Sequence, residues 1–149
     1  MNASSLCAIA TVSPGGRAHI SHVYLAWDDA FHVYWISDPD SLHSRNLATN
    51  RSAAVTVYDS RQVWGRPDRG IHLFGTARLV SGRQAAEAER TYSRRFRDHD
   101  TTSLESLRFY RFHPRTLQLF DERSLDAGTL VTVKVTRDRM TWLRTEVWT

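Results

Sequence analysis

The residues best suited to chemistry lie in a polar segment that spans residues 35–60. A proline turn ends a strand pattern there, and a short helix begins with Asp40 or Ser41 as its N-cap. The unpaired amides and the dipole of a helix N-terminus attract anions. Helical spacing places Ser44 and Arg45 on the face of Ser41, and hydroxyls beside a guanidinium suit a phosphate group. On this local pattern alone, a capped surface helix with one solvated arginine is the preferred interpretation.

Length and composition define the setting of this segment. The 149 residues predict one domain with a hydrophobic core, and the 24% charged and 41% hydrophobic residues argue against disorder. No apolar run approaches the roughly 20 residues of a membrane span, so no membrane partner is expected. The N-terminus lacks the pattern of a signal peptide, which makes the cytoplasm the expected location.

The charge and the single cysteine exclude further classes of protein. The net charge of +4 and the pI near 9.7 could indicate nucleic-acid binding. The basic residues are scattered among acids, however, and no nucleic-acid-binding motif is visible, so nucleic acid is not an expected partner. Cys7 excludes an internal disulfide and any multi-cysteine metal site, and its apolar surroundings predict a small buried side chain.

The N-terminal part of the chain predicts strands followed by the short helix. Short turns between the first three extended patterns predict that they pair as an antiparallel meander. The helix that begins near Ser41 is expected to end near Asn50, a residue tolerated in a left-handed C-cap. The three patterns cover Leu6–Val12, Arg17–Trp27 and Phe31–Ser37.

The rest of the chain predicts further strands and one longer helix. Apolar residues at helical spacing predict that helix over Gln84–His99, and Gly75 marks a bulge or a close approach within a long strand. Together the elements predict a mainly β, antiparallel domain with two inserted helices, closed as a barrel. The additional strands are expected at Ala53–Tyr58, Gly70–Val80, Leu107–Phe112, Thr116–Phe120, Leu130–Thr136 and Met140–Thr149.

Other chemistry-bearing side chains favour structural interpretations. Serine, histidine and aspartate are present, but no pattern places them together, so no catalytic residue is assigned. The odd spacing of His19 and His22 puts them on opposite faces of a strand, which argues against a metal site with His32. We expect no metal and hydrogen-bonded or solvated histidines. Trp64, on a polar connection, is the aromatic residue that could cover a ligand or contact an interface.

Several short motifs occur in a characteristic order along the chain. They are Ala10–Arg17, Ser21, Ser37–Ser41, Arg45–Leu47 with Asn50, and Gly75–Ala77. In this order the sequence resembles the pyridoxamine 5′-phosphate oxidase-like family of flavin-binding split barrels. The resemblance covers about residues 6–121 and does not place the segment after Asp121.

The resemblance implies a six-stranded antiparallel split β-barrel that forms a homodimer and holds FMN in two grooves at the dimer interface. It implies one flavin-binding domain over residues 1–149, in which residues 122–149 add strands or a dimer contact. The resemblance also favours an anion site at the N-terminus of the short helix over a capped surface helix with a solvated arginine. The implied FMN phosphate ligands are Ser37, Ser41, His43 and Arg45; Ser21, His22 and Val23 would lie beside the flavin ring, with Trp64 as the candidate lid.

The chain departs from the family pattern at the phosphate site. Relatives often carry an arginine–lysine pair where this chain has Leu42 and His43, so one charge is missing and the other is titratable. The arginine–leucine–histidine motif of enzymes that oxidise pyridoxamine phosphate is absent, so that reaction is not expected.

The resemblance therefore implies an FMN-dependent oxidoreductase acting on an unidentified small molecule, and it leaves open whether the protein is an enzyme. One alternative is a reductase of the same fold that uses the deazaflavin F420, whose polyglutamate tail would need a longer basic groove. The other alternative is a non-catalytic barrel that binds flavin or haem or has no cofactor. Haem is the least expected of these ligands.

Overall fold

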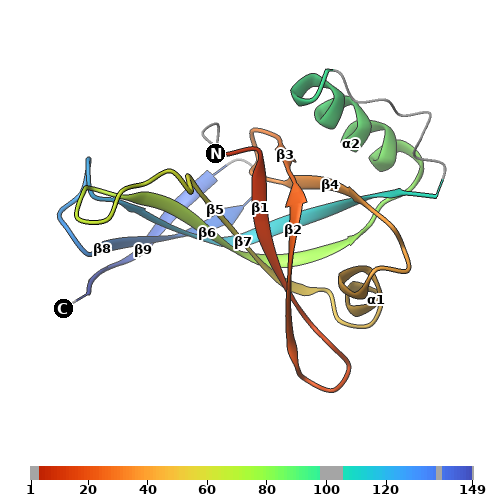
Figure 1. Cartoon of the computed structure of the whole chain (residues 1–149), viewed down its shortest axis with the longest axis horizontal. Helices are drawn as coiled ribbons and strands as arrows, with labels where there is room; N and C mark the ends of the chain where they lie inside the picture. Colours follow the sequence, from red (N-terminus) through yellow and green to blue (C-terminus); the bar gives the residue numbers. More distant parts are fainter. Residues whose placement is uncertain (1–3, 98–105, 137–138, 149) are drawn as a thin grey trace.

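Nine strands form one antiparallel sheet in this computed structural model, which describes residues 4–97, 106–136 and 139–148 (Figure 1). The mainly β class with two inserted helices is confirmed, although the described residues contain more strands than the six that the family resemblance implied. The strands are β1 (Leu6–Val12), β2 (Ala18–Tyr24), β3 (Ala26–Trp27), β4 (Val33–Ser37), β5 (Ser52–Tyr58), β6 (Arg69–Leu79), β7 (Arg108–Asp121), β8 (Thr129–Thr136) and β9 (Arg139–Val147), and the helices are α1 (Leu42–Thr49) and α2 (Gly82–Arg95).

The strand order is β2-β1-β5-β6-β7-β4-β3, with β8 and then β9 added beside β7. The predicted meander is correct for the pairing of β1 with β2 and for the turn between Trp27 and Phe31, across which β3 pairs with β4. The predicted second strand is, however, divided into β2 and β3, and β4 pairs with β7 on its other side rather than with β2. Leu25 and Ala26 are both fully buried, so the alternation of β2 stops there. The chain then passes to the opposite edge of the sheet before it forms β3 and β4.

Strand β7 runs without interruption through His113-Pro114-Arg115, so the prediction of two separate strands there is wrong. The register shifts opposite this segment, between Phe74 and Gly75, which confirms the bulge expected at Gly75. A Cβ atom on Gly75 would lie 2.1 Å from the backbone oxygen of His113, so only glycine permits this approach. Proline lacks an N–H group, and an irregular position in the ladder tolerates it.

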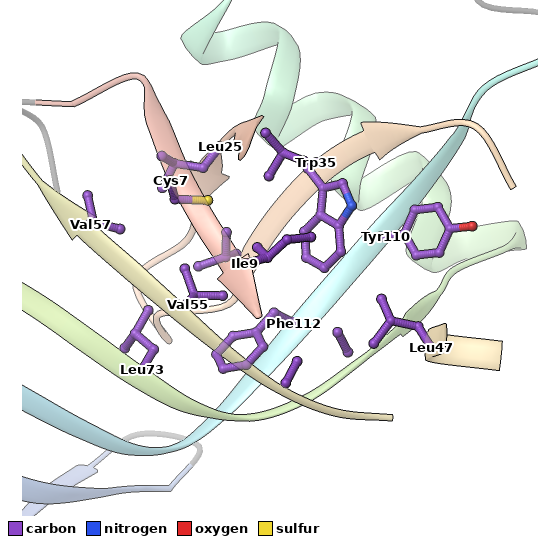
Figure 2. Close-up of a cluster of buried hydrophobic side chains, with 14 of the residues drawn as sticks. Cys7, Ile9, Leu25, Trp35, Leu47, Val55, Val57, Leu73, Tyr110 and Phe112 are labelled. Carbon is purple, nitrogen blue, oxygen red and sulfur yellow. The ribbon is translucent and has the colours of Figure 1, made fainter. Parts of the chain in front are cut away.

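The core lies between the inner faces of β1, β4, β5, β6 and β7 (Figure 2). Trp35 is buried and stacks on Tyr110, with the ring centroids 5.6 Å apart. Each large apolar side chain buried in this way contributes about 1.5–3 kcal/mol. Cys7 is buried as predicted, and burial raises the pKa of its thiol to about 12, so it is not a reactive thiolate.

Each helix is anchored by a different set of contacts. Helix α1 buries Leu47 in the core, and the buried side-chain amide of Asn46 donates to the hydroxyl of Thr11 on β1 at 3.0 Å. Its C-cap, Asn50, has an extended backbone (φ −135°), so the expected left-handed conformation is wrong. Helix α2 packs Ala88 against Tyr34 of β4.

Helix α2 ends at Arg95, and the predicted end at His99 lies outside the described residues. Neither helix in the described part of the chain is long and apolar enough to cross a membrane.

The last two strands confirm the predicted hairpin, whose final residue, Thr149, lies outside the described residues. The register places Met140 and Trp142 opposite Val135 and Val133, on the side of the sheet that faces the core. Both residues of β9 are nevertheless more than half exposed. Strand β9 therefore continues the apolar inner face of the barrel beyond the part that the chain itself covers.

Candidate functional site

A network of serine and histidine side chains lies at the N-terminus of α1. His43 is at its centre: Nε2 lies 2.7 Å from the hydroxyl of Ser37 and 3.2 Å from that of Ser41, and Nδ1 lies 3.1 Å from that of Ser21. The Ser41 hydroxyl also caps the helix by accepting from the backbone N–H of Ser44 at 3.4 Å. We call Ser21, Ser37, Ser41 and His43 the α1 network.

Three elements bring these residues together, and local sequence explains each placement. Ser37 is the last residue of β4, and Ser41 follows the proline turn as the N-cap of α1. Ser21 lies on β2, where residues alternate between inside and outside. His19 lies two residues before Ser21 on the same face, and its Nε2 is 2.9 Å from the Ser21 hydroxyl. The role of His19 was not predicted, although this spacing is a signal that could have indicated it.

The electrostatics of the α1 network differ from those of an arginine-lined phosphate site. Burial lowers the pKa of His43 below its ordinary value of 6.5, and the nearby charge of His19 lowers it further. The imidazole is therefore neutral at pH 7, and the hydroxyls can donate to it or accept from it. Arg45 is exposed and outside the network, where its guanidinium donates to the backbone carbonyl of Asp40.

The structure does not bring the other predicted cofactor residues to this place. His22 is exposed on the outer face of β2, where it lines an open hollow of about 380 Å³ with Tyr58 and Arg61. Val23 is buried in the core. Trp64 is fully exposed in the connection between β5 and β6.

A second network, which the sequence did not predict, lies at the other end of β4. His32 Nδ1 is 2.8 Å from a carboxylate oxygen of Asp28, and His32 Nε2 is 2.9 Å from Nδ1 of His113. The Tyr34 hydroxyl donates to the same carboxylate oxygen at 2.8 Å. We call Asp28, His32 and His113 the β4 relay. Within the described residues, no group of three or more potential ligands is placed to hold a metal ion.

The sequence and the fold together define the family. The pyridoxamine 5′-phosphate oxidase family model matches residues 1–121, and the chain therefore belongs to this family. Strands β8 and β9 follow the matched part. No protein among the curated sequences compared with this chain matches it.

Solved structures share the fold at low sequence identity. A pyridoxamine 5′-phosphate oxidase-related, FMN-binding protein from Nostoc punctiforme is 11% identical, with a TM-score of 0.69 over 97% of this chain and 88% of that one. A haem-binding protein from Mycobacterium smegmatis is 14% identical, with a TM-score of 0.71 over 92% of this chain and 55% of that one.

A protein of unknown function from Agrobacterium tumefaciens is 21% identical, with a TM-score of 0.67 over 78% of this chain and 51% of that one. The present chain thus spans about half the length of the last two proteins. Since solved structures with this fold include an FMN-binding and a haem-binding protein, the fold alone does not determine the cofactor.

Proposed function

We propose that the protein binds FMN, with the phosphate at the N-terminus of α1, and acts as an oxidoreductase on a small molecule. The observation that carries the proposal is the convergence of Ser21, Ser37, Ser41 and His43 in one network. These residues come from three elements and meet at a helix end that favours an anion. FMN, when bound, supplies the electron chemistry, while the chain holds the phosphate and orients the ring.

The donor set fits a phosphate group, provided that His43 turns outward and gains a proton. The hydroxyls of Ser21, Ser37 and Ser41 supply neutral donors, and hydrogen bonds to an anion are stronger than those to the imidazole. A nearby phosphate dianion favours the protonated imidazole, so FMN binding should take up a proton. The affinity for FMN should therefore fall as the pH rises through the pKa that His43 has in the complex.

The proposal includes a homodimer, for which the exposed inner face of β9 is the supporting feature. Trp142 and Val147 lie on the side of the hairpin that continues the core, and both are more than 60% exposed. A strand whose exposed face is apolar is a favourable contact surface for a second copy of the chain. A second copy that covers this face would also enclose the groove between the subunits.

The visible spectrum of the purified protein tests the choice of cofactor. Two flavin bands support the proposal, a single deazaflavin band favours F420, and a Soret band favours haem. A colourless protein that takes up no added FMN would contradict the proposal.

Variants test the place of binding. Ser41→Ala should weaken FMN binding about tenfold, the effect of one hydrogen bond to a charged group. Ser124→Ala is the matched control, because Ser124 is an exposed serine in the β7–β8 connection. Equal affinities of the two variants would remove the α1 network from the site.

A further inference from the structure

The β4 relay is the feature that the proposed flavin function does not use. Its three side chains come from distant positions, since His32 and His113 are 81 residues apart. The side chains of Asp28 and His32 are 22% and 19% exposed, whereas His113 is exposed on the outer face of β7. The relay therefore leads from a largely covered carboxylate to an imidazole in contact with solvent.

The hydrogen bonds of Asp28 fix the direction of the relay. One carboxylate oxygen accepts from the backbone N–H groups of Ala30 and His32, and the other accepts from the Tyr34 hydroxyl and from His32 Nδ1. Burial raises the pKa of Asp28, but the hydrogen bonds from His32 and Tyr34 outweigh this effect and leave it lowered. An ionised carboxylate only accepts, so the proton of neutral His32 must be on Nδ1.

The same argument carries over to His113. Because the Nδ1 of neutral His32 holds the proton, its Nε2 is an acceptor, and the proton of His113 must be on Nδ1. The Nε2 atom of His113 is thereby left with a lone pair that faces outward. A histidine whose tautomer is set through its other nitrogen is a recurring arrangement in acid–base and ligand sites.

The surroundings of His113 are cationic. Burial lowers the pKa of His113, and the positive charges of Arg111 and Arg115, together with that of His32 in its protonated form, lower it further, while Asp28 acts in the opposite direction. Strand β7 thus contributes two arginines close to an imidazole that is neutral at pH 7. Tyr34 of β4 lies beside the relay, and Glu87, Arg90 and Arg94 of α2 line a hollow together with Asp28.

We propose that the β4 relay is a binding site for an oxyanion that still carries a proton, such as a phosphate monoester monoanion. The ligand's O–H donates to Nε2 of His113, and its negative oxygens face Arg111 and Arg115. On proton transfer, the O–H bond breaks and an N–H bond forms at Nε2, so that His113 becomes an imidazolium and the ligand a dianion. The negative charge of Asp28, which contacts His32, offsets the positive charge added to His113. The site is independent of FMN binding.

The test is nitrogen NMR of the full chain at about pH 7, where His113 is neutral and inorganic phosphate, the probe, still carries a proton. The expected result is a proton on Nδ1 of His113 and a saturable phosphate-dependent shift of its Nε2 signal. His72 on β6 serves as the internal reference histidine. A proton on Nε2 of His113 in the unmodified protein would overturn the proposal, and so would equal phosphate-dependent shifts at His72 and His113.

The decisive variant is Asp28→Asn. Because one oxygen of residue 28 already accepts from two backbone N–H groups, the side-chain amide nitrogen must take the place that faces His32. This reverses both tautomers, moves the proton of His113 to Nε2, and weakens phosphate binding about tenfold. Asp29→Asn, an exposed neighbour with the same loss of charge, should leave both readouts unchanged.

A second variant keeps the proposal testable if Asp28→Asn does not fold. His32→Phe removes the acceptor for His113 Nδ1, so His113 should lose its tautomer preference and bind phosphate several-fold more weakly, as expected from one lost hydrogen bond. An unchanged tautomer in the folded variant would contradict the relay.

Discussion

The two ends of β4 carry histidine networks that differ in what the imidazole contacts. At the end near α1, His43 lies among serine hydroxyls, which can donate or accept. At the other end, His113 is connected through His32 to a carboxylate, which only accepts. The proton position on His43 is therefore adjustable, whereas that on His113 is set by Asp28.

This difference indicates that the two networks would bind different anions. Hydroxyl groups can rotate so that they donate to a phosphate instead of contacting the imidazole. The α1 network therefore suits a ligand that displaces His43. The β4 relay keeps its geometry and presents a lone pair, so it suits a ligand that brings its own proton. The predictions below separate the two networks, beginning with the largest expected effect.

Gly75→Ala should destabilise the protein by about 3 kcal/mol, at the upper end of ordinary substitutions. The new Cβ would lie 2.1 Å from the backbone oxygen of His113, so β6 and β7 must separate there. Urea denaturation measures the loss, and NMR should show that His113 loses its tautomer preference while FMN binding is retained. Gly15→Ala is the control, because the nearest atom to its Cβ would be 4.0 Å away. Equal stabilities of the two variants would contradict the close approach.

Ser41→Ala should reduce the free energy of unfolding by about 1 kcal/mol through loss of the N-cap. The Ser41 hydroxyl accepts from the N–H of Ser44 and also contacts His43. Thermal unfolding measures the loss, and the β4 relay should be unchanged in NMR. A change in the tautomer of His113 would show that the two networks are coupled.

The pH dependence of stability should distinguish the two histidines. Both have a folded-state pKa below the ordinary value, so the unfolded chain binds more protons below about pH 6.5. Their contribution to stability is complete above that pH and is lost as the pH falls through it. His43→Gln should reduce this acid sensitivity more than His113→Gln, because His43 is buried and His113 is exposed. Melting temperatures between about pH 5 and 8 test this, and the opposite order would contradict it.

Arg45→Ala should have the smallest effect. The exposed guanidinium lies outside the α1 network and donates to the backbone carbonyl of Asp40, so stability should change by less than about 0.5 kcal/mol. FMN affinity, measured by fluorescence quenching, should fall less than in Ser41→Ala. A larger fall would show that the guanidinium turns toward the phosphate.

The local elements were predictable because their signals are local. Alternating apolar residues define β1 and β5, and the N-cap at Ser41 follows from a hydroxyl after a proline turn. The course of β7 through Pro114 was not predictable, because the bulge that tolerates proline depends on Gly75 of another strand. The same reasoning applies to the place of β4 beside β7, which a pattern within either strand does not contain.

The candidate site was predictable in part for the same reason. The motif order indicated Ser21, Ser37, Ser41 and His43, which the structure brings together. The sequence could not show that His43 fills the space between the hydroxyls. Nor could it show the contact of His32 with His113, because that contact depends on the pairing of β4 with β7.

The most direct measurement compares the affinity of the full chain for FMN and for riboflavin, which lacks the phosphate, at about pH 6 and 8. If the α1 network holds the phosphate, FMN should bind at least tenfold more tightly than riboflavin at the lower pH. The advantage should shrink at the higher pH and in His43→Gln. Equal affinities for the two flavins at both pH values would contradict a phosphate site at α1.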